Sequence, residues 1–396
     1  MKYLALIVLL AGLAAGVTHT AAHHQLAGTC DSRRPEWLAC EDFETGDLGW
    51  PAWFGRSPFV ECLGCTGANG NMNNPARIRL AQGAAAAHSG EWALDMPAEA
   101  SAGYQGASLT YRSCAGAKRP GCRLTGYEAL YFRTWVKLAP DHQLVHHFLD
   151  ISGSRPDAYW ESDGNAGCRP DGQRWAGATL DLDRNNQLFF YTYFPGMKCD
   201  RGGYCSGDYV QQICTQCATK NMPCRSEPEC CWGNIFRPAQ PVVLPKDEWV
   251  CLELSMHLNT PGQADGSMSF WVNDVLALDQ HGMNWRNVPE LQLNKAWLQH
   301  YIAAGDAQQS NRVWFDDVVV STAHIGCGLP PAVATPTPVA SATPRASATP
   351  EASATVDATR APTATPSTPP TVRPAPTATA GPEWWRVYLP MLRRGG

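Results

Sequence analysis

The chain has 396 residues, a formal net charge of −5 and sixteen cysteines. The net negative charge and the absence of a run of basic residues argue against a nucleic-acid-binding protein. The even number of cysteines favours disulfides formed in an oxidising compartment.

The N-terminus has the pattern of a signal peptide. A charged start with Lys2 is followed by an apolar run over residues 4–17 and by small residues around Thr20. A bilayer span needs about 20 apolar residues, and neither this run nor any later one is long enough. We therefore expect residues 1–22 to be a signal peptide, and the mature protein to be secreted or to lie at the cell surface, with no transmembrane segment.

The body, residues 23–328, has the pattern of an all-β protein. Helical periodicity is nearly absent, and short alternating segments are separated by Gly, Pro, Asn and Asp. This pattern predicts a two-sheet antiparallel sandwich.

Residues 130–138 predict a strand with one apolar face and one aromatic and basic face. Aromatic rings stack on sugar rings, and Arg or Lys binds carboxylates or hydroxyls. We predict that this second face binds a glycan; the alternative is a solvated outer face. The residues concerned are Tyr131, Arg133, Trp135 and Lys137.

Two pairs of acids have a spacing of two residues, Asp181 with Asp183 and Glu161 with Asp163. Because Asp183 begins the turn-like run D-R-N-N, we interpret such pairs as solvated hairpin acids. The chain contains no E-x-D-x-x-E run, the pattern of retaining glycosidases on jelly rolls, which argues against that chemistry. Adjacent His146 and His147 would point to opposite faces of a strand, which disfavours a metal site.

The cysteines all lie between Cys30 and Cys327, and they are densest over residues 199–231. That segment has no core-forming apolar run, so we predict an insertion held by disulfides. Two C-x-x-C pairs leave a zinc site open as an alternative, although the compartment favours disulfides. The pairing does not follow from the spacing.

Residues 249–286 show the clearest strand alternation and the clearest turns. Alternate residues from Val250 to Leu258 are apolar, residues 260–266 form a Pro- and Gly-containing turn, and Asn273-Asp274 marks a tight hairpin. These features predict a β-meander that needs a second layer to bury its apolar face.

Beyond residue 328 the composition changes to Pro, Ala, Thr and Ser, which predicts a linker over residues 329–381 without a core. Residues 382–396 are again apolar, aromatic and basic. They resemble short tails of exported bacterial proteins, so we expect sorting or attachment to the cell envelope; the alternative is a disordered end. This C-terminal part carries net positive charge, which leaves the body acidic.

Several stretches resemble the concanavalin-A-like jelly rolls of secreted polysaccharide lyases, especially the alginate and glucuronan lyase-like group. They are D-F-E-T-G-D at 42–47, L-N-T-P-G at 258–262, F-W-V-N-D at 270–274, W-F-D-D-V-V-V-S-T at 314–322 and I-G at 325–326. The resemblance spans residues 40–327 and implies a jelly-roll fold.

The resemblance also implies site residues. The strand over residues 187–194 resembles a Y-x-Y strand whose tyrosines transfer protons, which places Tyr191 and Tyr193 as catalytic residues. His147 stands where the group has a cleft lysine. Gly177 and Thr179 stand where the group has the two functional members of an S-x-R motif, so both are missing. β-Elimination then needs another group to neutralise the uronate, and Arg133, Arg174 or calcium are the candidates.

A structural Ca²⁺ between the first and last strands is a further implication of the resemblance. Hard oxygen ligands are available in matching places, with ordinary edge-strand acids as the alternative reading. The acids are Asp42, Glu44, Asp47, Asp316 and Asp317.

We expect a secreted, disulfide-rich jelly roll that cleaves an acidic, uronate-containing polysaccharide by β-elimination, without a cofactor in the chemistry. His147 would act as the base and Tyr191 or Tyr193 as the acid. The alternative is a non-catalytic, lectin-like carbohydrate-binding protein of the cell envelope.

Overall fold

The computed structural model describes residues 29–32, 34–48, 59–63, 77–98, 105–113, 125–142, 147–158, 161–163, 165, 168–197, 233–302 and 311–328. All of them except Gly328 belong to the compact unit Met1–Cys327. The expected signal peptide, the cysteine-rich insertion at 199–231, the linker and the C-terminal tail lie outside the described residues.

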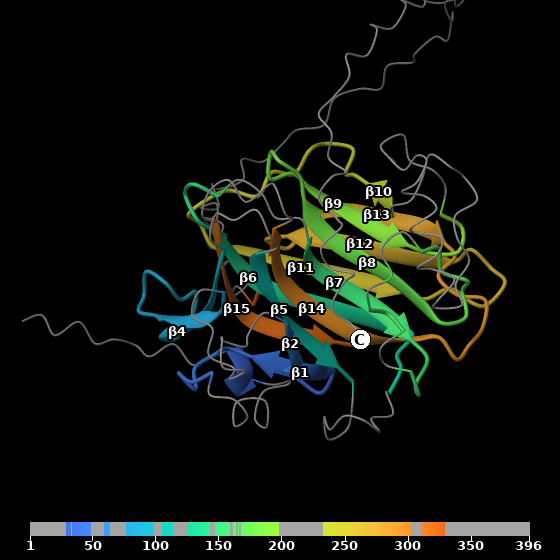
Figure 1. Ribbon diagram of the computed structural model, residues 1–396, viewed down its shortest axis with the longest axis horizontal. Helices are drawn as coiled ribbons and strands as arrows, with labels where there is room; N and C mark the ends of the chain where they lie inside the picture. The colour runs from blue at the N-terminus through green and yellow to red at the C-terminus, as the bar shows by residue number, and fades with distance from the viewer. Residues whose placement is uncertain are drawn as a thin grey trace, which may run out of the picture. The chain divides into compact units, whose positions relative to one another are not determined.

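Two antiparallel sheets contain nearly all the regular structure of the described residues, as the all-β prediction requires (Figure 1). Sheet A has the order β13-β12-β11-β6-β15-β4-β3, and β1 pairs with β15. Its strands are β1 (Trp37–Glu41), β3 (Arg79–Gln82), β4 (Trp92–Ala98), β6 (Ala129–Leu138), β11 (Val250–His257), β12 (Gly266–Val272), β13 (Val275–Met283) and β15 (Asn311–Ser321).

Sheet B has the order β10-β9-β8-β7-β14-β5-β2. Its strands are β2 (Phe59–Leu63), β5 (Gln105–Arg112), β7 (His147–Ser154), β8 (Trp175–Leu182), β9 (Leu188–Tyr193), β10 (Asn234–Phe236) and β14 (Gln292–Ile302). The helical element of the described part is one 3-10 turn, η1 (Thr29–Ser32).

The chain crosses between the sheets at every step from β1 to β3 and from β4 to β7, and again from β10 to β11, from β13 to β14 and from β14 to β15. The sheets pack face to face through apolar side chains: the rings of Phe148 and Phe315 lie 5.6 Å apart between centroids, and those of Phe190 and Phe270 lie 5.5 Å apart. The expected two-sheet antiparallel sandwich of jelly-roll type is therefore confirmed.

The predicted meander is also confirmed. Strand β11 buries its alternating apolar residues, including Leu252 and Leu254, and it pairs with β12 along their length. Asn273 and Asp274 have φ angles of 49° and 65°, as the tight hairpin between β12 and β13 requires. The local pattern was sufficient here because turns and alternation are properties of neighbouring residues.

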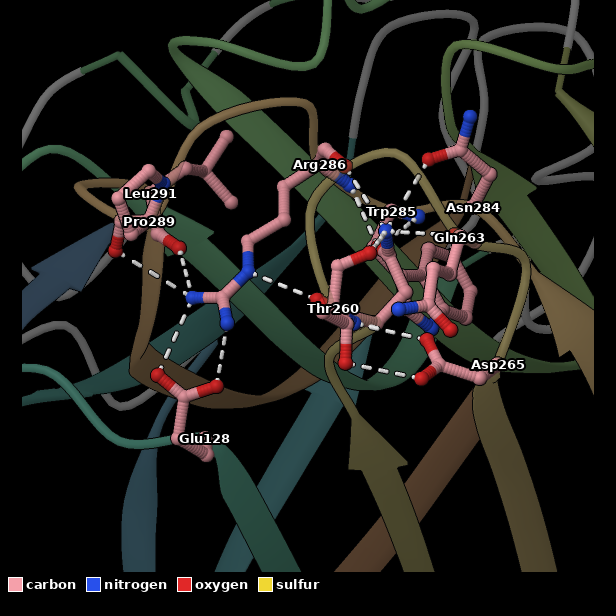
Figure 2. A network of polar contacts seen from close by, with 10 residues as sticks. Glu128, Thr260, Gln263, Asp265, Asn284, Trp285, Arg286, Pro289 and Leu291 are labelled. Atoms are coloured by element: carbon pink, nitrogen blue, oxygen red, sulfur yellow. Dashed lines mark hydrogen bonds and ion pairs between the residues drawn. The ribbon is translucent and has the colours of Figure 1, made fainter.

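A polar network fixes the end of this meander (Figure 2). The buried side chain of Asn259 accepts hydrogen bonds from the backbone N–H groups of Trp285 (2.7 Å) and Arg286 (2.8 Å). The guanidinium of Arg286 donates to the carbonyls of Asn259 (3.0 Å) and Leu291 (2.9 Å) and pairs with Glu128. Buried polar groups that are fully bonded hold one backbone path, so this network joins β11 to the segment before β14.

Disulfides reinforce the body. Cys30 pairs with Cys40, and Cys251 pairs with Cys327. Cys168 is also disulfide-bonded. The expectation of disulfides therefore holds for these residues. Within the described ranges, no helix has the length and apolar character to cross a bilayer.

Two buried histidines make the stability of the sandwich dependent on pH. The rings of His142 and His300 lie 6.0 Å apart, and Nδ1 of His300 donates to the carbonyl of Met96 (2.6 Å). Burial lowers the pKa of His142 to about 3 and that of His300 to about 4. An unfolded histidine takes up its proton near pH 6.5. Between pH 6.5 and 4 the unfolded state therefore binds more protons, which destabilises the folded protein.

We expect the free energy of unfolding to fall as the pH is lowered from 6.5 to 4, with each histidine contributing a slope of up to about 1.4 kcal/mol per pH unit. Urea denaturation at pH 7, 6 and 5 measures the slope. His300→Gln should reduce it, whereas His281→Gln, at an exposed position, should not. Equal slopes in His300→Gln and the unsubstituted protein would contradict this account.

Candidate functional site on the outer face of sheet B

Strand register places two rows of side chains across five strands of sheet B. One row joins residues of β5, β14, β7, β8 and β9: Arg112, Lys295, Ser152, Gly177 and Tyr193. The adjacent row contains Thr110, Trp297, Asp150, Thr179 and Tyr191. Residues opposite each other in antiparallel strands share a face.

These rows lie on the face directed away from sheet A. Phe190 packs against Phe270 of sheet A, so its neighbour Tyr191 points the other way. Tyr193 follows two residues later and has the same direction. We call this side the outer face of sheet B; it is the surface on which the predicted catalytic residues are found.

Three predicted catalytic residues come together there. The hydroxyls of Tyr191 and Tyr193 are hydrogen-bonded at 2.9 Å. The ring of His147, at the start of β7, lies 5.8 Å from that of Tyr191 between centroids. On its other side, the ring of Tyr301 lies 5.5 Å away. The structure therefore brings His147, Tyr191 and Tyr193 into one cluster, and their catalytic role stays a prediction.

Asp181 orients the histidine. Its Oδ2 lies 3.2 Å from Nδ1 of His147, and its Oδ1 accepts the backbone N–H of Phe148 at 3.1 Å. A proton on Nδ1 satisfies this contact and leaves Nε2 as the basic nitrogen. Burial lowers the pKa of His147 to about 4. The imidazole is therefore neutral near pH 7 and can accept a proton.

Asp150 occupies the middle of the second row. Its two oxygens accept hydrogen bonds from the hydroxyls of Ser152 (2.8 Å) and Thr179 (3.0 Å). Burial raises the pKa of Asp150, against the opposing charge of Lys295. This carboxyl group is thus held rigidly between the tyrosines and the cationic end of the rows.

Positive charge lies at the β5 and β14 end of the rows. Nζ of Lys295 lies 4.2 Å from the centre of the Trp297 ring and donates to Oδ1 of Asp163 at 2.7 Å. Arg112, directly opposite Lys295, pairs with the other oxygen of Asp163. The sheet therefore carries the residues predicted to transfer protons and these cations on one face.

Two glycines leave room for side chains of the two rows. A Cβ on Gly233 would lie 3.0 Å from the ring of Tyr191 and 2.7 Å from the carbonyl of Thr192. A Cβ on Gly177 would lie 3.1 Å from the Cβ of Ser152. Contacts this short require neighbouring atoms to shift, so side chains at these positions would disturb the rows.

The predicted glycan-binding stripe lies on the other sheet. All four residues are on β6. Tyr131, Arg133 and Trp135 lie opposite residues of β11 that point away from the shared core, and Lys137 lies opposite Trp314 of β15. The ring of His88 stacks on Trp135 at 3.6 Å, and Lys137 donates to the carbonyl of Ala85. Arg133 and Trp135 are buried. The stripe and the tyrosine cluster therefore belong to opposite sides of the sandwich and do not line one cleft.

Arg174, the other predicted cation, lies just before β8 and pairs with Asp171 at 2.8 Å. The structure leaves its proposed role untested. Charge on the face of Tyr191 comes instead from Arg112 and Lys295, which the sequence analysis did not select.

The acids expected to bind calcium accept backbone hydrogen bonds. Asp42 accepts from Cys30 and Glu44, Glu44 from Glu91 and Trp92, and Asp316 from His88 and Ser89. Among the described residues, no group of three or more His, Cys, Asp or Glu side chains is arranged to hold a metal ion. Calcium at Asp42, Glu44 and Asp316 stays a prediction.

The interpretation of the paired acids as solvated hairpin acids is wrong for Asp181. Asp183 does cap its turn, accepting from the backbone of Asn185 and Gln187. Asp181 is buried and bonded to His147, and Asp163 bridges two cations. The sequence could have indicated this position for Asp181. Asp181 lies two residues after Thr179 in β8, so both side chains are on the same face as Tyr191, which lies opposite Thr179.

No protein-family model matches the sequence, and no curated protein matches it. Polysaccharide lyases are among the solved structures similar to it. An alginate lyase in complex with an alginate tetrasaccharide is 11% identical, with 72% of this chain and 97% of that chain covered and a TM-score of 0.46.

Two further lyases show the same kind of likeness. An alginate lyase from a Chlorella virus is 13% identical, with 62% of this chain and 90% of that chain covered and a TM-score of 0.43. An endo-β-1,4-glucuronan lyase from the fungus Trichoderma reesei is 15% identical, with 63% and 89% covered and a TM-score of 0.38.

Proposed function

We propose that this protein is a secreted lyase that cleaves an acidic, uronate-containing polysaccharide by β-elimination on the outer face of sheet B. The observation that carries the proposal is the cluster of a neutral, oriented His147 beside two hydrogen-bonded tyrosines, on the face that also bears Arg112 and Lys295. The motif resemblance of residues 40–327 to such lyases and the signal-peptide pattern support it.

In the proposed reaction, the histidine and each tyrosine have one role. Nε2 of His147 takes the proton from C5 of the uronate, the electron pair forms the C4=C5 double bond, and the bond from C4 to the glycosidic oxygen breaks. Tyr191 donates its hydroxyl proton to that leaving oxygen. The hydroxyl of Tyr193, 2.9 Å from that of Tyr191, stabilises the resulting tyrosinate by a hydrogen bond.

Cations lie farther along the same face. The proton on C5 becomes acidic only when the adjacent carboxylate is neutralised, which requires a charged or hydrogen-bonding group in contact with the same uronate unit. Arg112 and Lys295 lie in the row of Tyr193, separated from it by the residues of β7 and β8. Because neighbouring strands lie about 4.8 Å apart, Lys295 is about 14 Å from Tyr193 along the row. An acidic chain laid across the rows would therefore place one uronate unit at the tyrosines and the carboxylate of another unit near these cations.

A non-catalytic carbohydrate-binding protein is the second candidate. The observation that favours it is the absence of an S-x-R motif, which the lyases that the sequence resembles carry at this place. Here Gly177 replaces the serine, and the neutral Thr179 replaces the arginine. In that case the aromatic rings of Tyr191 and Trp297 would stack on sugars without turnover.

Absorbance near the unsaturated-uronate band separates the two candidates. The purified protein is incubated with a panel of uronate-containing polysaccharides, with and without calcium. A rise with one of these substrates is the expected result. A flat trace across the panel, with the same glycans retarding the protein in an affinity gel, would favour the carbohydrate-binding function.

The pH dependence of turnover should report His147. Because its pKa is lowered to about 4, the base is already neutral at pH 5, whereas an ordinary histidine would be mostly protonated. We expect the acidic limb of kcat/KM against pH, which reports the free enzyme, to have its midpoint near pH 4. A midpoint near 6.5 would contradict the assignment of His147 as the base.

A further inference from the structure

Asp163 places a carboxylate against two buried cations on the outer face of sheet B. Its Oδ1 accepts from Nζ of Lys295 at 2.7 Å, and its Oδ2 accepts from Nη2 of Arg112 at 2.5 Å. The side chains of Arg112 and Lys295 are each 1% exposed, whereas that of Asp163 is 39% exposed. The cations are thus fixed in the sheet and the anion is at the surface.

The cations are held by rigid elements. Arg112 of β5 and Lys295 of β14 are direct partners in the antiparallel ladder, and the ring of Trp297 lies beside Nζ of Lys295. Asp163 comes from none of these strands: it belongs to the segment that joins β7 to β8. A preformed pair of donors filled by one carboxylate has the character of a carboxylate-binding site.

We propose that Arg112 and Lys295 form a carboxylate-binding subsite of the acidic glycan, which Asp163 occupies until the carboxylate of a uronate unit displaces it. This inference rests on the proposed function of the same face, and it identifies which part of the substrate the subsite recognises.

The exchange conserves charge. Buried cations that lose the anion hydrogen-bonded to them carry a desolvation cost of several kcal/mol, so the departure of Asp163 favours its replacement by another carboxylate. A uronate carboxylate can accept the same two hydrogen bonds, one from the guanidinium and one from the ammonium. A neutral sugar supplies no charge and leaves Asp163 in place. The internal carboxylate therefore makes the face selective for acidic chains.

The same contact lowers the apparent affinity for the substrate. Asp163 is an intramolecular competitor, and only the fraction of molecules in which it has left the cations can bind the uronate there. Removing its negative charge while keeping its shape should therefore strengthen the binding of uronates.

Asp163→Asn tests this prediction. The variant and the unsubstituted protein are titrated calorimetrically with a uronate tetrasaccharide and with the same tetrasaccharide after its carboxyl groups are reduced to alcohols. We expect Asp163→Asn to bind the uronate about tenfold more tightly, a change of about 1.4 kcal/mol, and the neutral sugar without change.

Glu161→Gln is the matched control. It makes the same change of charge two residues earlier, where Glu161 pairs with Arg155 outside the rows. Its affinity for the uronate should equal that of the unsubstituted protein. Equal or weaker uronate binding by Asp163→Asn, or equal strengthening in both variants, would overturn the proposal.

A crystal structure of the unsubstituted protein with the uronate tetrasaccharide covers the case in which Asp163→Asn does not fold. The expected result is a sugar carboxylate within hydrogen-bond distance of Nζ of Lys295 and the guanidinium of Arg112, with Asp163 moved away. A sugar bound while Asp163 keeps both contacts would overturn the proposal.

The absorbance assay keeps this inference separate from the proposed function. Tighter uronate binding by Asp163→Asn without an unsaturated product from any variant would retain the subsite and reject the lyase. An unsaturated product together with unchanged affinity in Asp163→Asn would retain the lyase and reject the displacement of Asp163.

Discussion

Replacing Tyr191 with Phe should lower kcat by about 10²- to 10⁴-fold, the usual contribution of a positioned general acid. The substitution removes only the hydroxyl, which is hydrogen-bonded to that of Tyr193 at 2.9 Å, and retains the ring next to His147. Binding of the glycan should change much less than turnover. Initial rates of absorbance increase give kcat, and calorimetry gives the dissociation constant.

Tyr131→Phe is the control for this substitution. It removes the same hydroxyl from the outer side of sheet A, where the group is hydrogen-bonded to His257, also at 2.9 Å. Turnover should be retained because this side of the sandwich faces away from the cluster. Equal losses of kcat in the two variants, or full activity in Tyr191→Phe, would exclude Tyr191 as the acid.

Asn259→Ala should lower the free energy of unfolding by about 3 kcal/mol or more, because it leaves several buried backbone groups without partners. The side chain accepts from the N–H groups of Trp285 and Arg286 and donates to the carbonyls of Gln263 and Arg286, each at 2.9 Å or less. Urea denaturation followed by tryptophan fluorescence measures the change.

Asn284→Ala provides the comparison within the same network (Figure 2). Its side-chain oxygen makes one long contact, 3.3 Å, with the amide of Asn259. The same Asn-to-Ala change should therefore cost much less. Similar losses in the two variants would show that the network does not depend on Asn259.

The meander could be predicted because its determinants are close in sequence. Alternation placed Leu252 and Leu254 on one face, and the Asn273-Asp274 pair has the conformation that a tight hairpin needs. The turn at residues 260–266 likewise joins β11 to β12. Each of these features depends on residues only a few positions apart.

The site could be predicted only in part because it depends on register between distant strands. The resemblance selected Tyr191 and Tyr193, which are two residues apart on β9. Arg112 and Lys295 share a row with Tyr193 only through pairings across β14, β7 and β8. No local pattern in the sequence encodes those pairings, so these cations were not selected.

The stripe on β6 illustrates a different limit. Alternation separated Arg133 and Trp135 from the core residues correctly, but it does not say what lies outside the sheet. The segment of His88 covers Trp135, and the backbone of Ile325 and Gly326 donates to Glu253 beside Arg133. Segments from both ends of the domain therefore bury a face that alternation alone predicts to be open.

The Cys251–Cys327 disulfide determines how the domain responds to mechanical force. Tension on the chain beyond Gly328 reaches Cys327 first and passes through the covalent bond to Cys251 on β11. Strand β11 is held by β6 on one side and β12 on the other. The load is therefore carried first by an interior strand with a neighbour on each side, and it bypasses β15, which ends at Ser321. If residues beyond 328 attach the protein to a surface, the sandwich can remain folded under a pull that would unzip a terminal strand.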